Sequence, residues 1–298
     1  MAVVDTLISL LPPNTAAALE EHRAELTQVR LRPGRPAQIA WGRGGEDMSG
    51  EVIAPEKLAR VLAALMDFSV YARQGELDEG FFTLEDGSRV GVCGRMIAEN
   101  GRIRMTEIGS ACIRVSRELP GCADGLMERI DGPDGIRSTL LISPPGGGKT
   151  TLLRDIARQL SERGHCVGIA DERHELAACH RGVPALDVGA RTDVMDGCPR
   201  PDAMARMLRS MAPEVFVADE IGDADDARAL ADAVRCGAAV VASAHAAGLK
   251  DVLSRRCLRE VVDSGAFEMI ALLGPVPGQV GAVWLRGEGE GAATWRRA

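Results

Sequence analysis

The sequence predicts an α/β protein in which a domain built on a mainly parallel sheet follows a smaller α+β domain. In the second half of the chain, apolar runs of strand length alternate with amphipathic helical segments, an order typical of parallel strands joined by right-handed crossovers. In the first half, helical spacing and hairpin signals occur in mixed order. A last run, GQVGAVWLRG (278–287), is expected to add an edge strand. The other strand-length runs of the second half are STLLIS (138–143), CVGIADE (166–172), EVFVADE (214–220), AAVVASAH (238–245) and FEMIALL (267–273).

The boundary between the two domains is expected in MERIDGPDGIRS (127–138), where glycines and a proline stand among charged residues. We accordingly predict an N-terminal domain over residues 1–130 and a C-terminal domain over residues 137–298. Within the first domain, LEDGS (84–88) is an Asp-Gly hairpin signal between alternating residues. Residues 54–77 of the same domain show helical spacing.

The segment SPPGGGKT (143–150) matches the phosphate-binding pattern GxxxxGK[ST], except that serine replaces the first glycine. Glycines let backbone amides approach an anion closely, and the helix that follows adds the positive end of its dipole. We expect Lys149 to contact the β and γ phosphates of ATP, and Thr150 to offer its hydroxyl to Mg²⁺. The two prolines lack N–H donors but lie early in the loop, so the amides of residues 146–151 are intact. The predicted nucleotide-binding residues are Ser143, Pro144, Pro145, Gly146, Gly147, Gly148, Lys149, Thr150 and Thr151.

The run EVFVADEIG (214–222) supplies the acidic residues that phosphoryl transfer requires. Asp219 follows an apolar strand and is expected at the mouth of the sheet, where ligands bind in α/β folds. There it would help to hold Mg²⁺. Glu220, the next residue, is the candidate that polarises the attacking water.

Two further polar residues end strands of the same predicted sheet. His245 could sense the γ-phosphate, and a structural role is the alternative for a lone histidine. Glu172 follows Asp171 at the end of another strand. One interpretation places this pair of acids near the water or the metal. The alternative is that the pair caps a helix or forms a surface ion pair.

Blocks spread over nearly the whole chain carry a family resemblance. They are VRLRPGRP (29–36), GSRVGVCGR (87–95), IRVSRE (113–118), SPPGGGKTTLLRD (143–155), DERHELA (171–177), RTDVMDGCP (191–199), RSMAPEVFVADEIG (209–222) and SAHA (243–246). Together these blocks resemble the ATPases of type II and type IV secretion systems, and more closely their sporulation branch, the stage III sporulation AA family. The resemblance implies a RecA-like P-loop ATPase that assembles as a hexamer.

By the same resemblance, the protein would act during endospore formation, in the mother-cell cytoplasm at the base of a trans-envelope complex. Its partners would be membrane proteins of a channel or secretion-like machine. In secretion ATPases, arginines of the first half approach the nucleotide. We expect Arg114 or Arg117 to approach the nucleotide in this protein, either within one chain or across a subunit interface. The alternative for each arginine is an exposed salt bridge.

Composition limits the remaining function classes. The net charge of −8 and the single tyrosine argue against nucleic acid as a partner. No stretch reaches about 18 uncharged apolar residues, and the N-terminus lacks a basic region, so neither a membrane span nor a signal peptide is expected. We expect a cytoplasmic protein that docks on a membrane complex. A nucleic-acid-dependent translocase or helicase and a nucleotide-gated scaffold that hydrolyses little are the alternative functions.

Overall fold

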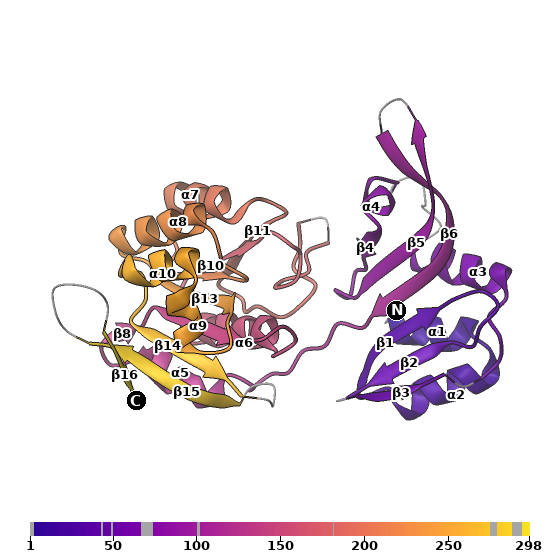
Figure 1. Cartoon of the computed structure of the whole chain (residues 1–298), viewed down its shortest axis with the longest axis horizontal. Coiled ribbons are helices and arrows are strands. Elements are labelled where there is room, and N and C mark those ends of the chain that lie inside the picture. Colours follow the sequence, from indigo (N-terminus) through magenta and orange to yellow (C-terminus); the bar gives the residue numbers. More distant parts are fainter. Residues whose placement is uncertain are drawn as a thin grey trace. The chain divides into compact units, whose positions relative to one another are not determined.

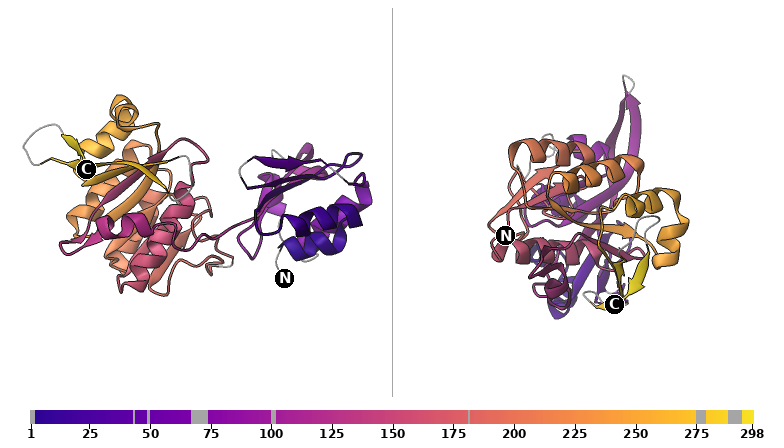
Figure 2. Two further views of the ribbon diagram at one scale, coloured as in Figure 1. Left: turned by 90° about the horizontal axis from the view of Figure 1, so that it is seen from below. Right: turned by 90° about the vertical axis from the view of Figure 1, so that its left-hand side faces the viewer.

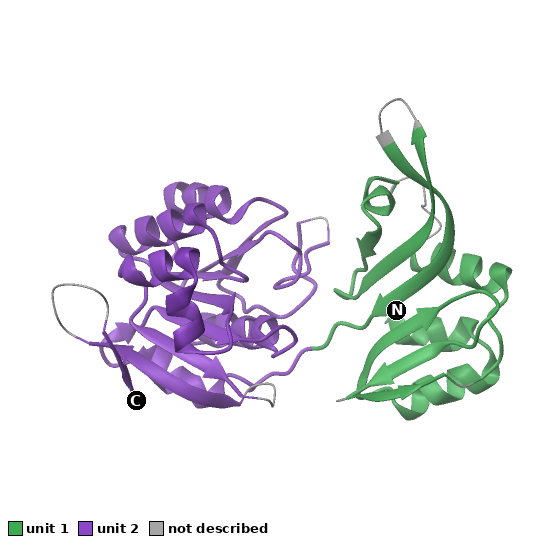
Figure 3. Cartoon of the chain, viewed as in Figure 1, with its two compact units in different colours: residues 1–117 green, residues 118–298 purple. Residues whose placement is uncertain are grey.

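The chain folds into two compact units, residues 1–117 and residues 118–298 (Figure 1 and Figure 3). The structure is a computed structural model. It describes residues 3–42, 44–48, 50–66, 74–99, 102–180, 182–274, 279–287 and 294–298.

The segment 127–138, where the domain boundary is predicted, lies inside the second unit. It forms the end of helix α5 (Asp124–Ile130) and the hairpin of strands β7 (Asp131–Gly132) and β8 (Gly135–Ile136). Ile130 is fully buried in the core of that unit. The turn residues of this segment therefore shape a hairpin, and the division between the units comes earlier in the chain.

The first unit packs helices against an antiparallel sheet. Among its described residues, the strands follow the spatial order β3-β2-β1-β6-β5-β4, and every neighbouring pair is antiparallel. Apolar residues of the helices and of alternate strand positions form one core, which includes Leu7, Val29 and Ile113. The elements are α1 (Val3–Leu10), α2 (Pro13–Glu21), β1 (Leu26–Leu31), β2 (Gln38–Trp41), β3 (Gly45–Asp47), α3 (Pro55–Leu65), α4 (Gln74–Asp78), β4 (Phe81–Thr83), β5 (Arg89–Glu99) and β6 (Arg102–Arg114).

Two local predictions for this unit have different outcomes. The Asp-Gly turn is confirmed, since it joins β4 to β5 and Gly87 takes the left-handed conformation with a φ of +77°. The helix predicted over residues 54–77 is shorter than expected. Helix α3 ends at Leu65 and α4 begins at Gln74, and residues 67–73 lie outside the described part of the chain.

The second unit is built on a sheet whose described strands follow the order β11-β10-β12-β13-β9-β14-β15-β16. The first six strands run parallel, as the alternating pattern predicts. Strand β15 then pairs antiparallel with β14, and β16 pairs antiparallel with β15. The edge-strand prediction for residues 278–287 is wrong in one respect. These residues contain β15, but the chain end pairs with the outer side of β15 as β16. The bounds are β9 (Thr139–Ser143), β10 (Val167–Asp171), β11 (Thr192–Asp196), β12 (Val215–Ala218), β13 (Ala239–His245), β14 (Met269–Leu273), β15 (Val280–Arg286) and β16 (Trp295–Arg297).

Helices cover both faces of this sheet (Figure 2). Helices α5 and α6 pack on one face, and α7 to α10 pack on the other. The central strands are thus buried on both sides, which explains their continuous apolar runs. None of the helices in the described ranges has both the length and the apolar character that a bilayer span requires. The remaining bounds are α6 (Lys149–Glu162), α7 (Arg200–Ser210), α8 (Ala224–Arg235), α9 (Leu249–Ser254) and α10 (Arg256–Asp263).

The carboxyl ends of neighbouring parallel strands define where the site lies. Strand β13 lies between β9 and β12, so one strand separates the glycine loop from the acidic pair. At the strand ends, Ser143 is in register with His245, and Ala218 is in register with Ala242. Residues that follow these strands therefore meet at one edge of the sheet.

Candidate active site

The glycine loop between β9 and α6 has the left-handed turns that its composition predicts. Gly146 and Gly148 have φ angles of +75° and +80°. A Cβ atom at Gly147 would lie 2.3 Å from Oγ of Ser143, so close packing requires glycine there. Ser143, at the position of the expected first glycine, is buried and donates a hydrogen bond to the carbonyl of Pro144 at 2.8 Å. The serine is accommodated because its side chain turns into the loop.

The start of α6 presents backbone amides to this loop. The first backbone hydrogen bond of the helix runs from Leu152 N to Gly148 O at 3.0 Å. The amides of residues 149–151 thus precede the hydrogen-bonded part of the helix. Pro144 and Pro145 lie before this stretch and remove none of its donors. These amides and the helix dipole together favour an anion at this end of the helix.

The side chain of Lys149 reaches back to the start of the loop. Its Nζ lies 3.3 Å from both the carbonyl oxygen and the hydroxyl of Ser143, and 2.8 Å from Nδ1 of His245. Burial lowers the pKa of Lys149, and the charges of Asp219 and Glu220 oppose this effect. A phosphate oxygen is a stronger partner for a buried ammonium than these neutral acceptors. Lys149 is therefore placed to bind an anion at the loop.

Thr150 and Asp219 face one another across the strand ends. The hydroxyl of Thr150 donates to Oδ2 of Asp219, and the hydroxyl of Ser243 donates to Oδ1. Ser243 is fully buried. A hydroxyl and a carboxylate are the oxygen donors that Mg²⁺ takes beside substrate phosphates. The structure brings the two predicted metal residues together, and Ser243 fixes the orientation of the carboxylate.

Glu220 has a backbone conformation that is rare for its residue type. Its φ is +53°, which costs on the order of 1–3 kcal/mol in a residue with a side chain. Its amide donates to Oγ of Ser243 at 3.1 Å and to Oδ1 of Asp219 at 3.0 Å, which holds the turn. Its carboxylate lies 2.9 Å from Nε2 of His245 and forms an ion pair with Arg173. The predicted water-polarising residue is thus held at both its backbone and its side chain.

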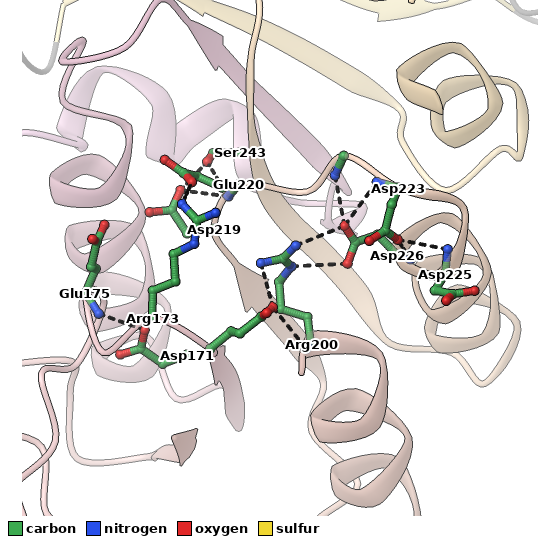
Figure 4. A network of polar contacts seen from close by, with 12 residues as sticks. Asp171, Arg173, Glu175, Arg200, Asp219, Glu220, Asp223, Asp225, Asp226 and Ser243 are labelled. Carbon is green, nitrogen blue, oxygen red and sulfur yellow. Dashed lines mark hydrogen bonds and ion pairs between the residues drawn. The ribbon is translucent and has the colours of Figure 1, made fainter. Parts of the chain in front are cut away.

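The loop after β10 borders the same pocket as the acidic pair (Figure 4). Asp171 is buried, and its carboxylate accepts hydrogen bonds from the amides of Glu175 and Ala177 at 2.9 and 2.8 Å. This residue therefore shapes the loop. Glu172 also lines the pocket, and its carboxylate lies 2.9 Å from the guanidinium of Arg200.

Arg173 and Arg200 also lie at this pocket and were not among the predicted site residues. The Arg200 side chain is 12% exposed and donates two hydrogen bonds of 3.1 Å to the buried carboxylate of Asp226. Burial lowers the pKa of Arg200, but the hydrogen bond and charge of Asp226 raise it above its ordinary value. Arg173 lies in the block DERHELA (171–177), directly after a strand-ending acid pair, and that position was the available signal.

The two arginines predicted to complete the site belong to the first unit. Arg114 ends β6, is exposed, and is in register with Arg89 and Gln28 on the neighbouring strands. Arg117 follows it, and its guanidinium donates to the carbonyl oxygen of Ala24. The cluster described above lies wholly in the second unit.

The residues of this cluster fit a magnesium-bound nucleotide. Gly146 and Gly148, both in the left-handed conformation, carry no side chain that could block an anion from the loop amides. The Lys149 ammonium has neutral hydrogen-bond partners, so a phosphate can take their place. Thr150 and Asp219 offer a hydroxyl and a carboxylate oxygen to a hard cation. The arrangement can hold phosphate, hold a divalent cation and orient a water molecule.

Solved structures with a similar fold include secretion and pilus ATPases. The ATPase DotB of Legionella pneumophila matches with a TM-score of 0.59 at 16% identity, over 88% of this chain and 76% of that chain. The pilus retraction motor PilT, solved with bound ADP, matches with a TM-score of 0.57 at 16% identity, over 94% of this chain and 80% of that chain. At this identity the likeness concerns the fold alone, and it confirms the predicted RecA-like fold.

A curated relative shares much more of the sequence. Stage III sporulation protein AA of Bacillus subtilis (strain 168) is 37% identical over 276 residues, which cover 89% of this chain and 89% of that protein. The family described as "Sporulation stage III, protein AA" matches residues 12–289. The resemblance carried by the sequence blocks is therefore confirmed, and this chain belongs to the sporulation stage III protein AA family.

Proposed function

We propose that this protein is an ATPase that energises a membrane-associated complex in endospore formation. The observation that carries the proposal is the polar cluster in which Lys149, Thr150, Asp219, Glu220 and His245 meet at the carboxyl ends of parallel strands. Membership of the sporulation family supports the cellular context, and the fold shared with secretion and pilus ATPases supports the activity. In this proposal the protein works in the cytoplasm, docked on membrane proteins of a secretion-like channel.

Binding of ATP is the first task of the cluster. The amides of residues 149–151 and the Lys149 ammonium bind oxygens of the β and γ phosphates. Thr150 and Asp219 would hold Mg²⁺, whose chemistry there is to neutralise the charge on those phosphates. Ser243 keeps the Asp219 carboxylate oriented through its buried hydrogen bond.

Hydrolysis is the second task, and it falls to Glu220. The water oxygen forms a bond to the terminal phosphorus while the bond from that phosphorus to the bridging oxygen breaks and ADP leaves. The Glu220 carboxylate accepts the proton of the water, and inorganic phosphate is the other product. His245 steadies the carboxylate through its contact with Oε1, and Lys149 holds the phosphate side of the reaction.

A homo-oligomer, in this proposal a hexamer, completes the site. An arginine from a neighbouring copy can contribute about 10³–10⁵ in rate. Arg114 is the better supported candidate because it is exposed beside Arg89, whereas Arg117 donates to the carbonyl oxygen of Ala24. If Arg114 acts in trans, mixing inactive Arg114→Ala protein with inactive Lys149→Ala protein restores part of the activity. Absence of any recovery would exclude a role of Arg114 across subunits.

The test of the activity is steady-state ATP hydrolysis over a range of protein concentrations. We expect specific activity that rises with concentration, vanishes in Lys149→Ala and falls by at least about 10²-fold in Glu220→Gln. Glu220→Gln should still bind ATP, because it keeps the loop and Lys149. Hydrolysis that survives in Lys149→Ala would overturn the proposal. Stimulation by single-stranded nucleic acid would favour a translocase, and a rate equal to buffer at every concentration would favour a gated scaffold.

A further inference from the structure

The ion pair between Arg173 and Glu220 joins two loops that follow different strands of the sheet. Arg173 comes from the loop after β10, and Glu220 comes from the turn after β12. Figure 4 shows the Arg173 side chain reaching toward Asp219 and Glu220. Because the proposed hydrolysis needs the Glu220 carboxylate for water, what Arg173 does to that carboxylate bears on the reaction.

The loop that carries Arg173 is held firmly. From one side, the buried carboxylate of Asp171 accepts the amides of Glu175 and Ala177. From the other side, the Arg154 guanidinium donates to the carbonyl oxygens of Glu175 and Leu176 at 2.7 and 2.6 Å.

Backbone strain lies at both ends of the ion pair. His174, next to Arg173, has a φ of +57°, and Glu220 has a φ of +53°. Such conformations persist where surrounding contacts over-determine them, and they gather at functional sites. The backbone at each end of the pair is therefore held in an unusual conformation by its surroundings.

The head group of Arg173, in contrast, is loosely bound. The Arg173 side chain is 60% exposed, and ion pairs of that kind contribute little to stability. Arg200, the neighbouring arginine of the pocket, is 12% exposed and clamped between Glu172 and Asp226. Arg173 is thus the pocket arginine whose partner can be exchanged at small cost.

Arg173 also lies at the end of a polar chain that begins at the phosphate loop. Lys149 contacts His245, His245 contacts one oxygen of Glu220, and Arg173 occupies the other oxygen. A terminal phosphate bound by Lys149 brings negative charge to this group, and a guanidinium binds phosphate with two parallel hydrogen bonds.

We propose that Arg173 exchanges the Glu220 carboxylate for the terminal phosphate of ATP, and that this exchange frees the carboxylate oxygen that receives the water proton. Arg173 is then a ligand of the terminal phosphate supplied by the same chain. ADP has no such phosphate and leaves the ion pair with Glu220 in place. The inference rests on the proposed function, since it requires ATP at the glycine loop.

The test compares the affinities of two nucleotides in the presence of Mg²⁺, measured by calorimetry on the full chain. The probes are ADP and the β,γ-imido analogue of ATP, which is not hydrolysed. We expect Arg173→Ala to weaken binding of the imido analogue about tenfold and to leave the ADP affinity within about twofold. Arg173→Lys should recover part of the loss, because it restores charge without the planar fork. The control is Arg228→Ala, which removes an exposed ion pair with Asp225 on α8 and should change neither affinity.

A second variant tests the exchange itself. Glu220→Gln removes the charge that pairs with Arg173, so Arg173 is available before the nucleotide binds. In the chain that keeps Arg173, this change should raise the affinity for the imido analogue several-fold. In a chain that already carries Arg173→Ala, the same change should leave that affinity unchanged. Parallel changes for both nucleotides would show that Arg173 does not distinguish the terminal phosphate, and no change for either would show a surface ion pair only. Either result would overturn this inference while leaving the ATPase proposal intact. If the unaltered chain binds neither nucleotide, both proposals fail.

Discussion

Nζ of Lys149 lies 2.8 Å from Nδ1 of His245. An ammonium group has donors only, so the ring must accept at Nδ1 and carry its proton on Nε2. That proton points at Oε1 of Glu220, 2.9 Å away. One imidazole ring therefore links Lys149 of the glycine loop to the proposed water-polarising carboxylate.

The first prediction concerns this tautomer. In the nucleotide-free protein at about pH 8, the ¹⁵N spectrum should show His245 with an unprotonated Nδ1 and a protonated Nε2. The chain has five histidines, so His245→Gln serves to assign the signal. A proton on Nδ1 would contradict the donor role of Lys149 in this contact.

The second prediction is that the buried lysine destabilises the nucleotide-free protein. Because burial lowers the pKa of Lys149 in the folded chain, its charge opposes folding at neutral pH. That contribution disappears as the pH rises through the lowered pKa toward the ordinary lysine value. Lys149→Met should therefore unfold at the same temperature as the unaltered chain or a few degrees above it.

The unfolding temperature of Lys149→Met should also be measured with nucleotide present. ADP with Mg²⁺ should raise the unfolding temperature of the unaltered protein through mass action and leave Lys149→Met unchanged. A large loss of stability in the variant without nucleotide would show that Lys149 is a structural residue.

The third prediction concerns the middle glycine of the loop. Gly147→Ala places a Cβ atom 2.3 Å from Oγ of Ser143, so the loop must shift and its amides lose their alignment. We expect nucleotide affinity to fall at least about tenfold, as measured by calorimetry. Gly125→Ala is the control, because Gly125 lies in α5 with no atom within 4 Å of an added Cβ. This control should bind normally and be as stable as the unaltered chain or more so.

The fourth prediction distinguishes a loss of orientation at Asp219, the proposed Mg²⁺ ligand, from a loss of fold stability. Ser243→Ala removes the hydroxyl that fixes Asp219, so the Mg²⁺ concentration for half-maximal activity should rise about 10–100-fold. Ser161→Ala is its match, since Ser161 is also buried but accepts the amide of Arg191 at 2.7 Å. That variant should lose stability and keep its Mg²⁺ dependence. Equal Mg²⁺ dependence in both variants would remove Ser243 from the site.

The fifth prediction concerns Asp155 on α6. Burial alone would raise the pKa of Asp155, but hydrogen bonds from the amide of Ala123 and from Arg158 and Gln159 lower it below its ordinary value. The stability that this group contributes is present above the ordinary aspartate pKa, roughly pH 4, and is lost as the pH falls through the lowered value.

Asp155→Asn should therefore lose about 2–3 kcal/mol of unfolding free energy at neutral pH, measured by urea denaturation. The difference from the unaltered chain should shrink below about pH 4. The control is Asp225→Asn, whose partner Arg228 is exposed, and it should stay within about 0.5 kcal/mol. A difference that persists in acid would mean that the carboxylate charge is not the cause.

Contiguous residues were enough to predict the local parts of the site. The loop from Ser143 to Thr150 and the strand that ends before Asp219 are each encoded in a single segment. Their geometry depends on glycine at left-handed positions and on apolar runs of strand length, and both can be read directly from the sequence. The alternation of such runs with helices also predicted the parallel sheet, because the crossover between parallel strands needs a helix-length segment.

The sequence by itself therefore determined the glycine loop, the acidic strand end and the α/β fold. Only the tertiary structure decided that β13 lies between β9 and β12, that His245 connects Lys149 to Glu220, and that Arg173 meets Glu220. The left-handed backbone of Glu220 had no signal either, since its residue type does not favour it. The physical reason is that apolar periodicity records which residues are buried and does not record which strands are neighbours. Contacts between strand ends depend on that order, and the same pattern is compatible with several orders.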